Sequence, residues 1–169
     1  FWDNLNKILE KCPRVNTTIM STYNALSVPS YKKLLDGVYG LKKTYGSDDR
    51  YWNSAVFLDA SYLRFPTHQT VQVLPQKWSM EILQQAQYAD YLGVPLFDTK
   101  HIGYSDIEIQ KLKRLYDWMI SANDKDSINR QRYNFGKFFK EHDIRRGTNF
   151  KETFPEFAEF YDDCQRIKL

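Results

Sequence analysis

The fold is decided by Val15-Asn-Thr-Thr-Ile-Met-Ser-Thr22 and by a second stretch further along the chain, Ala55-Val-Phe-Leu-Asp59. Both are short, rich in β-branched or apolar residues and bounded by turn residues, which predicts two β-strands. Between them, apolar residues recur at helical spacing and stop near Gly46, as expected of a helix that ends at a glycine. Such a helix is long enough to cross over between two parallel strands, so we expect an α/β fold.

A third stretch, Thr70-Val-Gln-Val-Leu74, has the same β-branched character and predicts a third strand. About three parallel strands with flanking helices would form a partial β/α barrel. The later part of the chain shows helical spacing instead. We therefore expect a half-barrel α/β region over residues 1–92 and a helical C-terminal extension over residues 93–169 that packs on it.

One face of the first predicted strand is polar, because alternate side chains of a strand point to opposite faces. A parallel strand that is buried on both sides is usually apolar on both. The polar side therefore indicates either a cavity that binds a ribose or an amino-acid group, or an exposed face of the sheet. Gln72 raises the same question on the third strand. The apolar face carries Val15, Thr17 and Ile19; the polar face carries Asn16, Thr18, Met20 and Thr22 and continues into Asn24.

Asp59 follows an apolar run at the end of the second predicted strand. In α/β proteins, ligand sites gather at the carboxyl ends of the strands. A carboxylate there can bind a hydroxyl or an amine of a ligand. The alternative is a helix cap or an ion pair with a neighbouring arginine.

The end of the chain contains Asp143-Ile-Arg-Arg-Gly-Thr-Asn-Phe150, which is typical of a basic turn between helices. Thr153 stands three residues before Glu156, with Pro155 between them. This spacing predicts a capping box that starts the last helix.

Composition excludes several classes of site. Of the two cysteines, Cys12 and Cys164, each lies on the apolar side of a helical pattern, which predicts two reduced, buried thiols and a cytoplasmic protein, although a disulfide between them stays open. The histidines are scattered, so we expect no metal site.

No apolar run approaches the ~20 residues of a membrane span. The chain starts at Phe1 within amphipathic sequence, so we expect further residues upstream. The three histidines are His68, His101 and His142.

The segment from Lys111 to Arg146 is rich in lysine and arginine, with aromatic residues among them. Such a pattern can bind a nucleic-acid backbone and stack on its bases. Acidic residues dilute it, which favours a solvated helical face instead. The candidate nucleic-acid-binding residues are Lys113, Arg130, Arg132, Tyr133 and Lys137.

Three stretches together resemble the second half of a radical S-adenosylmethionine enzyme, of the small twitch-domain type common in bacteriophages. They are Val15–Leu26, Phe57–Pro66 and Val71–Pro75, and the ending Asp143–Phe150 with Thr153–Glu156 also looks like that family. The resemblance implies a partial parallel β/α barrel. It also implies a CxxxCxxC loop in the first half, whose three thiolates hold a 4Fe-4S cluster. This chain contains no such loop, so it is either the C-terminal part of such an enzyme or a relative that has lost the chemistry; the start without Met favours the first. We expect the chain to be inactive alone and to need a missing N-terminal half, or a second chain, to complete the barrel.

By position, the resemblance implies a cofactor-binding set that contacts S-adenosylmethionine and a substrate-binding set near the mouth of the barrel. Two other hypotheses stay open: a basic, aromatic-rich module that binds nucleic acid, and a phage accessory interaction domain without a ligand. The implied cofactor-binding residues are Asn16, Thr18, Asn24, Gln72 and Leu74, and the substrate-binding residues are Asp59, Tyr62 and Arg64.

Overall fold

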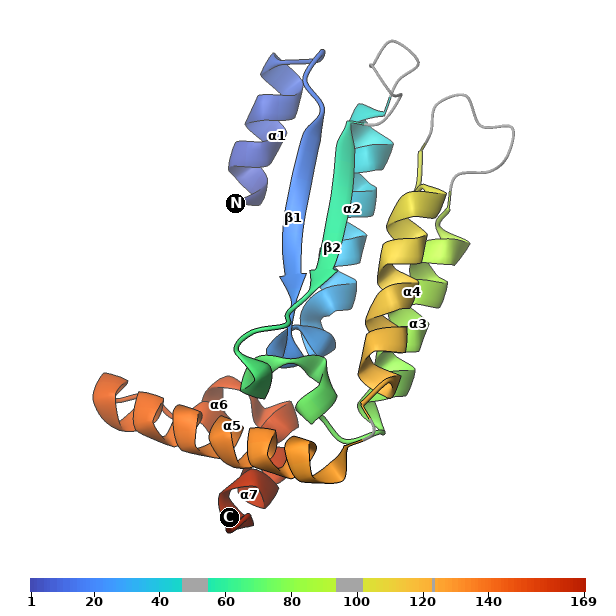
Figure 1. The fold of residues 1–169 in the computed structure, drawn as a ribbon. Helices are drawn as coiled ribbons and strands as arrows, with labels where there is room; N and C mark the ends of the chain where they lie inside the picture. The colour runs from blue at the N-terminus through green and yellow to red at the C-terminus, as the bar shows by residue number, and fades with distance from the viewer. Residues whose placement is uncertain (47–54, 94–101, 123) are drawn as a thin grey trace.

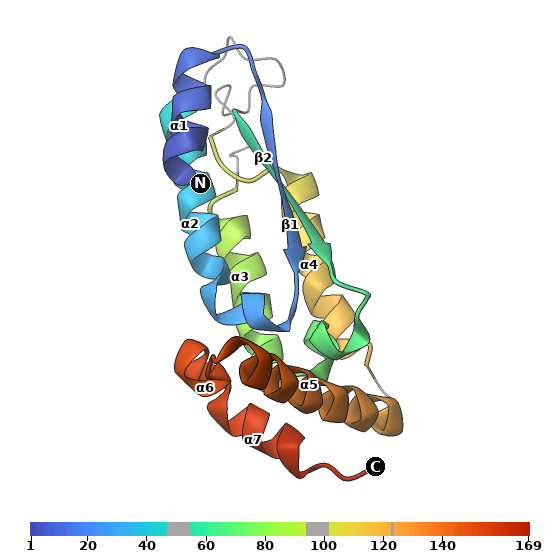
Figure 2. The same ribbon diagram turned by 90° about the vertical axis from the view of Figure 1, so that its left-hand side faces the viewer.

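The computed structural model describes residues 1–46, 55–93, 102–122 and 124–169. Two strands and the helices α1 to α4 form an elongated α/β part, and the C-terminal helices α5 to α7 cross one end of it (Figures 1 and 2). The elements are α1 (Trp2–Lys11), β1 (Thr17–Tyr23), the 3-10 helix η1 (Ala25–Ser30), α2 (Tyr31–Tyr45), β2 (Val56–Tyr62), the 3-10 helices η3 (Thr67–Gln69) and η4 (Val71–Val73), α3 (Trp78–Tyr91), α4 (Asp106–Ile120), α5 (Lys125–Arg146), α6 (Phe150–Thr153), the 3-10 helix η5 (Pro155–Phe157) and α7 (Ala158–Arg166).

β1 and β2 pair in parallel, with Thr17 opposite Val56 and Tyr23 opposite Tyr62. The helix α2 connects them, and its chain leaves the helix at Gly46, as the sequence predicts. The α/β class and the parallel pair are thus confirmed.

The predicted third strand is wrong, because Val71–Val73 forms the 3-10 helix η4. The valines Val71 and Val73 are fully buried where η4 meets α4 and α5, so a turn satisfies the same apolar side chains that suggested a strand. The sheet in the described part of the chain has two strands.

The outer edge of β2 is covered by α4 rather than by a further strand. The backbone N–H of Leu58 donates to Oε1 of Glu108 over 2.7 Å. The same carboxylate lies 2.9 Å from Nζ of Lys42, and both side chains are almost completely buried. Its Oε2 also accepts from the backbone N–H and the hydroxyl of Ser105, each over 2.8 Å. A helix carboxylate thus takes the place of a neighbouring strand at this edge.

Burial shapes the ionisation of this interior. Desolvation lowers the pKa of Lys42, and the charge of Glu108 opposes that effect. Desolvation raises the pKa of Tyr31 to about 12, and it also raises the pKa of Tyr23 and of Tyr104.

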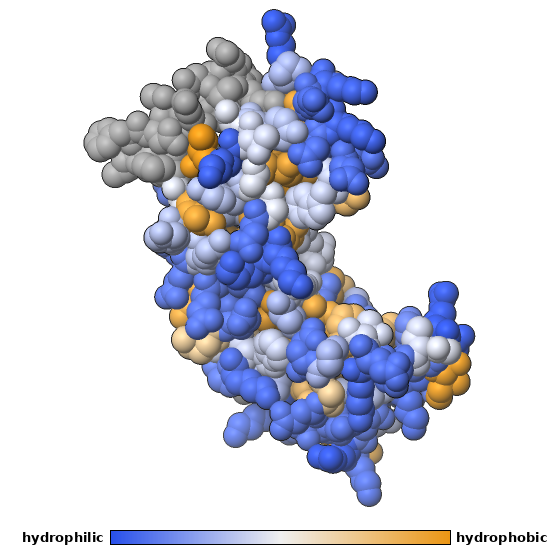
Figure 3. All heavy atoms as spheres, turned by 180° about the vertical axis from the view of Figure 1, so that it is seen from behind, coloured by the Kyte–Doolittle hydropathy of each residue, from blue (hydrophilic) through white to orange (hydrophobic). Residues whose placement is uncertain are grey.

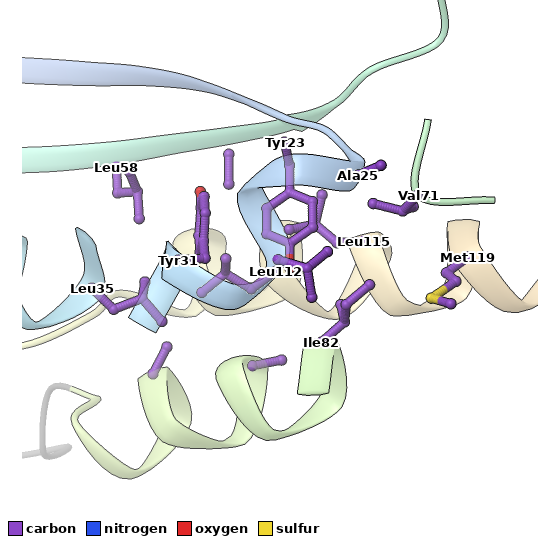
Figure 4. Packing of buried hydrophobic residues seen from close by; sticks show 14 of the residues in the cluster. Tyr23, Ala25, Tyr31, Leu35, Leu58, Val71, Ile82, Leu112, Leu115 and Met119 are labelled. Atoms are coloured by element: carbon purple, nitrogen blue, oxygen red, sulfur yellow. The ribbon is translucent and has the colours of Figure 1, made fainter. Parts of the chain in front are cut away.

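The main core lies between the sheet and the helices α2, α3 and α4. In Figure 4, Leu58 of β2 points into a layer that also receives Leu35 of α2, Ile82 of α3 and Leu112 of α4. Two hydrogen bonds through the side chain of Gln85 cross this layer. The hydroxyl of Tyr23 donates to Oε1 of Gln85 over 2.7 Å, and Nε2 of Gln85 donates to the carbonyl of Val28 over 2.7 Å.

The C-terminal helices have a core of aromatic rings. The ring centroids of Phe135 and Phe139 lie 4.6 Å apart, as do those of Phe139 and Phe150, and Phe150 lies 4.7 Å from Tyr161. Gly136 lets α5 and α7 approach closely, because a Cβ there would lie 3.1 Å from the backbone of Cys164.

The turn between α5 and α6 has a different helix-capping residue from the one predicted. Gly147 adopts φ 63° and ends α5, and both carboxylate oxygens of Asp143 accept hydrogen bonds from the turn, one from the N–H of Phe150. The cap of α6 is Asn149, whose side chain accepts from Lys151 N–H. The predicted capping box at Thr153 is wrong, because α6 already includes Thr153, and its hydroxyl donates to the carbonyl of Asn149.

Packing divides the molecule after α4. This helix lies against β2 and α3 and belongs to the α/β part, whereas α5 packs mainly on α7 and on the turns η3 and η4. By these contacts α4 groups with the strands and α5 with the C-terminal helices, and the boundary at residue 92 stays a prediction. Figure 3 shows the helix side of the molecule, where hydrophobic residues appear in small, separate groups among hydrophilic ones.

Candidate functional site

The two-stranded sheet has one covered and one open face. Along β1, burial alternates so that Ile19 and Tyr23 face the helices while Thr18, Met20 and Thr22 face solvent; Met20 is 82% exposed. On β2, the residues opposite are Phe57, Asp59 and Ser61. Figure 1 looks onto this open face, with α2 behind the strands and α4 beside β2. The predicted alternation is confirmed, and the polar face of β1 is exposed rather than enclosed by the described residues.

A pocket of about 380 Å³ lies at the carboxyl end of β2, beside the open face. It is lined by Asp59, Tyr62 and Arg64, the three residues predicted to bind substrate, together with Lys111 and Arg114 of α4. Nζ of Lys111 lies 2.6 Å from the Asp59 carboxylate. Nη2 of Arg64 donates to the hydroxyl of Tyr62 over 3.0 Å. The structure thus brings together all three predicted residues.

The helix α4 supplies the part of this pocket that sequence reasoning missed. Lys111, Arg114 and Trp118 are spaced by three and four residues, so they lie on one side of α4, which runs along β2. The Trp118 ring stacks on Tyr62, with centroids 4.8 Å apart and planes 18° from parallel. Only the packing of α4 on β2 brings these residues to Asp59, although the helical spacing of the basic residues was visible in the sequence.

The pocket carries an excess of positive charge. Arg64, Arg114 and Lys111 are cations, and Asp59 is the carboxylate among them. No carboxylate in the described ranges lies within ion-pair distance of Arg64 or Arg114, both of which are exposed. Two guanidinium groups beside a neutralised Asp59–Lys111 pair can hold a carboxylate or a phosphate by paired hydrogen bonds.

The residues predicted to bind cofactor do not share one environment: two bond within the fold, one is buried and two are exposed. Asn24 caps η1, since its Oδ1 accepts from the N–H groups of Leu26 and Ser27. The amide of Gln72 donates to the carbonyl of Trp118 over 2.8 Å and to Ser121. The side chain of Leu74 is buried. Asn16 and Thr18 are exposed, and Thr18 belongs to the open face.

The predicted nucleic-acid-binding residues do not form one surface. Lys113 on α4 pairs with Asp90 over 2.9 Å. Arg132 on α5 turns inward and donates to the carbonyls of Val73 and Leu74 over 2.7 and 3.3 Å. Arg130, Tyr133 and Lys137 lie on α5, and of these Lys137 lines a groove at its C-terminal end.

The cysteines do not form a metal centre. Both are free; Cys164 is buried, and burial raises the pKa of its thiol to about 12. Cys12 is exposed, so the prediction of a buried thiol there is wrong: α1 ends at Lys11, and Cys12 follows it as the cap. No group of three metal-binding side chains occurs within the residues that the structure describes, which exclude His101.

Comparison with known proteins adds no relative. No protein-family model, curated protein or solved structure matches the chain. The interpretation of the pocket therefore rests on its own geometry and on the resemblance of the sequence. Among the described helices, none is both long and apolar enough to cross a membrane.

Proposed function

We propose that this chain is the cofactor- and substrate-side portion of a radical S-adenosylmethionine enzyme, of the small twitch-domain kind found in bacteriophages. The observation that carries the proposal is the pocket at the carboxyl end of β2, which gathers Asp59, Tyr62 and Arg64. The resemblance implies Tyr62 and Arg64 near the substrate, and the position of Asp59 towards the end of the strand makes it a ligand-binding candidate. A cytoplasmic location, expected from the sequence, belongs to the same proposal.

The arrangement of layers supports the same proposal. In a parallel β/α barrel, helices cover the outside, the opposite face of the strands lines the interior, and ligands bind at the carboxyl ends of the strands. Here β1 and β2 are parallel, helices cover one face, and Thr18, Met20 and Asp59 lie on the other. The open face of β1 and β2 is the part of a barrel wall that further strands would enclose. A missing N-terminal half or a second chain would supply them.

The chain itself does not fit a 4Fe-4S cluster. Such a cluster needs three thiolates, and the sequence has two cysteines. Cys12 follows α1 and Cys164 lies in α7, at opposite ends of the molecule in Figures 1 and 2. We therefore expect the chain alone to be inactive, and any cluster to be held by the partner that completes the barrel.

The residues of this chain would bind and orient rather than react. Thr18 presents a hydroxyl on the open face for S-adenosylmethionine, and Asn16 lies directly before β1. Asn24 and Gln72 use their side chains within the fold. Arg64 and Arg114 would hold an anionic group of the substrate. Asp59, kept in place by Lys111, would accept a hydrogen bond from a hydroxyl or an amine.

The coding sequence that directly precedes Phe1 tests the class. We expect it to encode three cysteines with CxxxCxxC spacing in the same frame; a frame without them contradicts a missing N-terminal half and leaves only a second chain to supply the cluster. Reconstitution of the present chain with iron and sulfide should give no cluster absorbance.

In the protein that includes the upstream segment, equilibrium dialysis tests the cofactor site. The substitution Thr18→Val removes one hydroxyl at nearly constant volume, and we expect it to weaken S-adenosylmethionine binding about tenfold. Lys33→Gln, on the exposed side of α2, is the control. Equal affinities of both variants and the parent protein would contradict a role of the open face.

A further inference from the structure

A second concave site lies outside the pocket just described. The last three turns of α5 and the turn η3 enclose a groove of about 530 Å³. Figure 1 shows the segment between β2 and α3, which contains η3, lying against α5. This groove belongs to neither predicted set of substrate- or cofactor-binding residues, and it is on a different element from Asp59.

Positive charge dominates the groove. Lys137, Arg145 and Arg146 line it, and Glu141 is the one acidic residue among its lining residues. Arg145 lies 4.0 Å from Glu141, at the limit of an ion pair, while Lys137 and Arg146 have no ion-pair partner in the described parts of the chain. The end of α5 contributes about half a negative charge. The three cations exceed this charge and that of Glu141 together, so the groove attracts anions.

Aromatic rings stand beside these cations. Phe138 is 41% exposed, and its centroid lies 5.0 Å from the ring of His68 on η3 and 6.4 Å from that of His142, with planes 30° apart in the second case. A row of rings next to cationic side chains is the arrangement by which proteins stack bases while neutralising phosphates.

His68 forms part of the wall of the groove. Its Nε2 atom is buried and has no hydrogen-bond partner within the described residues, and burial lowers the pKa of the ring. The His68 ring therefore adds aromatic surface beside Phe138, and the positive charge of the groove comes from its lysine and arginines.

We propose that this groove binds a nucleotide, with its phosphate against Lys137 and Arg146 and its base against Phe138. The nucleotide is either free or part of a single strand, since both present the same phosphate and base. The proposal is independent of the barrel proposal, because it uses no residue of the sheet.

Fluorescence anisotropy with a labelled single-stranded oligonucleotide of mixed sequence tests the groove. We expect Lys137→Gln and Arg146→Gln each to weaken binding about tenfold and to lower the slope of log affinity against log salt by about 0.7. Lys33→Gln makes the same charge change on α2, none of whose residues lines the groove, and should leave affinity within twofold. Absence of binding at low salt, or equal losses in all three variants, would overturn the proposal.

Competition identifies the source of the nucleotide and the role of the ring. If the strand is the ligand, an unlabelled strand displaces the probe at far lower concentration than a mononucleotide; equal potency of the two would assign the groove to free nucleotides. Phe138→Leu should weaken binding of the strand severalfold while leaving inorganic pyrophosphate as a competitor of unchanged potency. An unchanged affinity for the strand in Phe138→Leu would refute the stacking role.

Discussion

Around Glu108, the α/β part buries a carboxylate, an ammonium group and hydrogen-bonded hydroxyls, whereas around Phe150 the C-terminal helices bury aromatic rings. Among the residues that the structure describes, every fully buried polar or charged one precedes residue 109. Hydrogen bonds and ion pairs are directional, so the first core fixes how α4 lies along the edge of β2. Packing between aromatic rings requires that the rings fill the space and lie close together, but it requires no bond between particular atoms. The difference suggests that precise placement is needed where α4 supplies Lys111 and Arg114 to the pocket.

The largest effect should follow from Glu108→Ala. It leaves the Lys42 ammonium group buried without its partner and the Leu58 N–H without an acceptor. We expect the free energy of unfolding to fall by about 4 kcal/mol, measured by urea denaturation. The double variant Lys42→Met/Glu108→Leu is the control and should lose less, because it buries no charge. A loss under about 1 kcal/mol in Glu108→Ala would contradict the importance of the pair.

Alkaline pH should weaken the α/β part more than the C-terminal helices. The folded state raises the pKa of Tyr23, Tyr31 and Tyr104, that of Tyr31 to about 12. Unfolded tyrosines lose their proton near pH 10, so the stabilisation is complete below about pH 10 and decreases as pH rises above it. At about pH 11, each of the three tyrosines should lower the free energy of unfolding by about 1 kcal/mol relative to its value at neutral pH.

Hydrogen exchange resolved by segment measures this loss. Tyr31→Phe removes one titrating group and should reduce the loss at alkaline pH relative to the parent protein. In the C-terminal helices, desolvation raises the pKa of Tyr161 as well, so a smaller loss is expected there. An equal or greater loss in α5 to α7 would contradict the comparison of the two cores.

Phe150→Ala should disrupt the aromatic core. Phe150 is 2% exposed and contacts the rings of Phe139 and Tyr161, so its removal leaves a cavity. We expect a loss of about 3 kcal/mol, seen as faster hydrogen exchange in α5, α6 and α7. Phe150→Leu, which keeps more volume, should lose less. Equal acceleration throughout β1, β2 and α4 would show that the two cores unfold as one.

The smallest effect should come from Gly136→Ala. A Cβ at this position would lie 3.0 Å from Nε2 of Gln165 and 3.1 Å from the backbone of Cys164, so α5 and α7 must separate slightly. We expect thermal denaturation to report a loss of about 1 to 2 kcal/mol. Gly40→Ala is the matched control, since a Cβ in that helix meets no atom within 4 Å and should stabilise by about 0.5 kcal/mol. Similar effects of both substitutions would contradict the close contact.

Prediction from sequence succeeded where one segment carries the whole signal. The alternation in Val15–Thr22 predicted both the strand and its two faces, because alternate side chains of a strand lie on opposite sides of the sheet. It failed at Thr70–Leu74, because β-branched residues indicate burial but do not distinguish a strand from a buried turn. At Thr153, the capping spacing was present, but this residue already belongs to α6, which begins at Phe150 and is capped by Asn149.

For the candidate site, the sequence placed Asp59, Tyr62 and Arg64 close together because β2 and the segment after it hold all three. It could not bring in Lys111 and Arg114, which come from a helix whose position depends on packing. The nucleic-acid hypothesis named Lys137, and the groove then adds His68 and Phe138 from two elements that meet only in the folded chain.

By itself, the sequence determined two parallel strands joined by a helix, the polar side of β1, and a helical, aromatic C-terminal region, because these follow from the spacing of residues along one segment. Tertiary structure alone decided that the edge of β2 is closed by Glu108, 50 residues from Leu58, and that basic residues of α4 reach the end of the strand. Such contacts depend on how the helices pack, and packing is set by the summed burial and hydrogen bonding of the whole chain rather than by any local pattern.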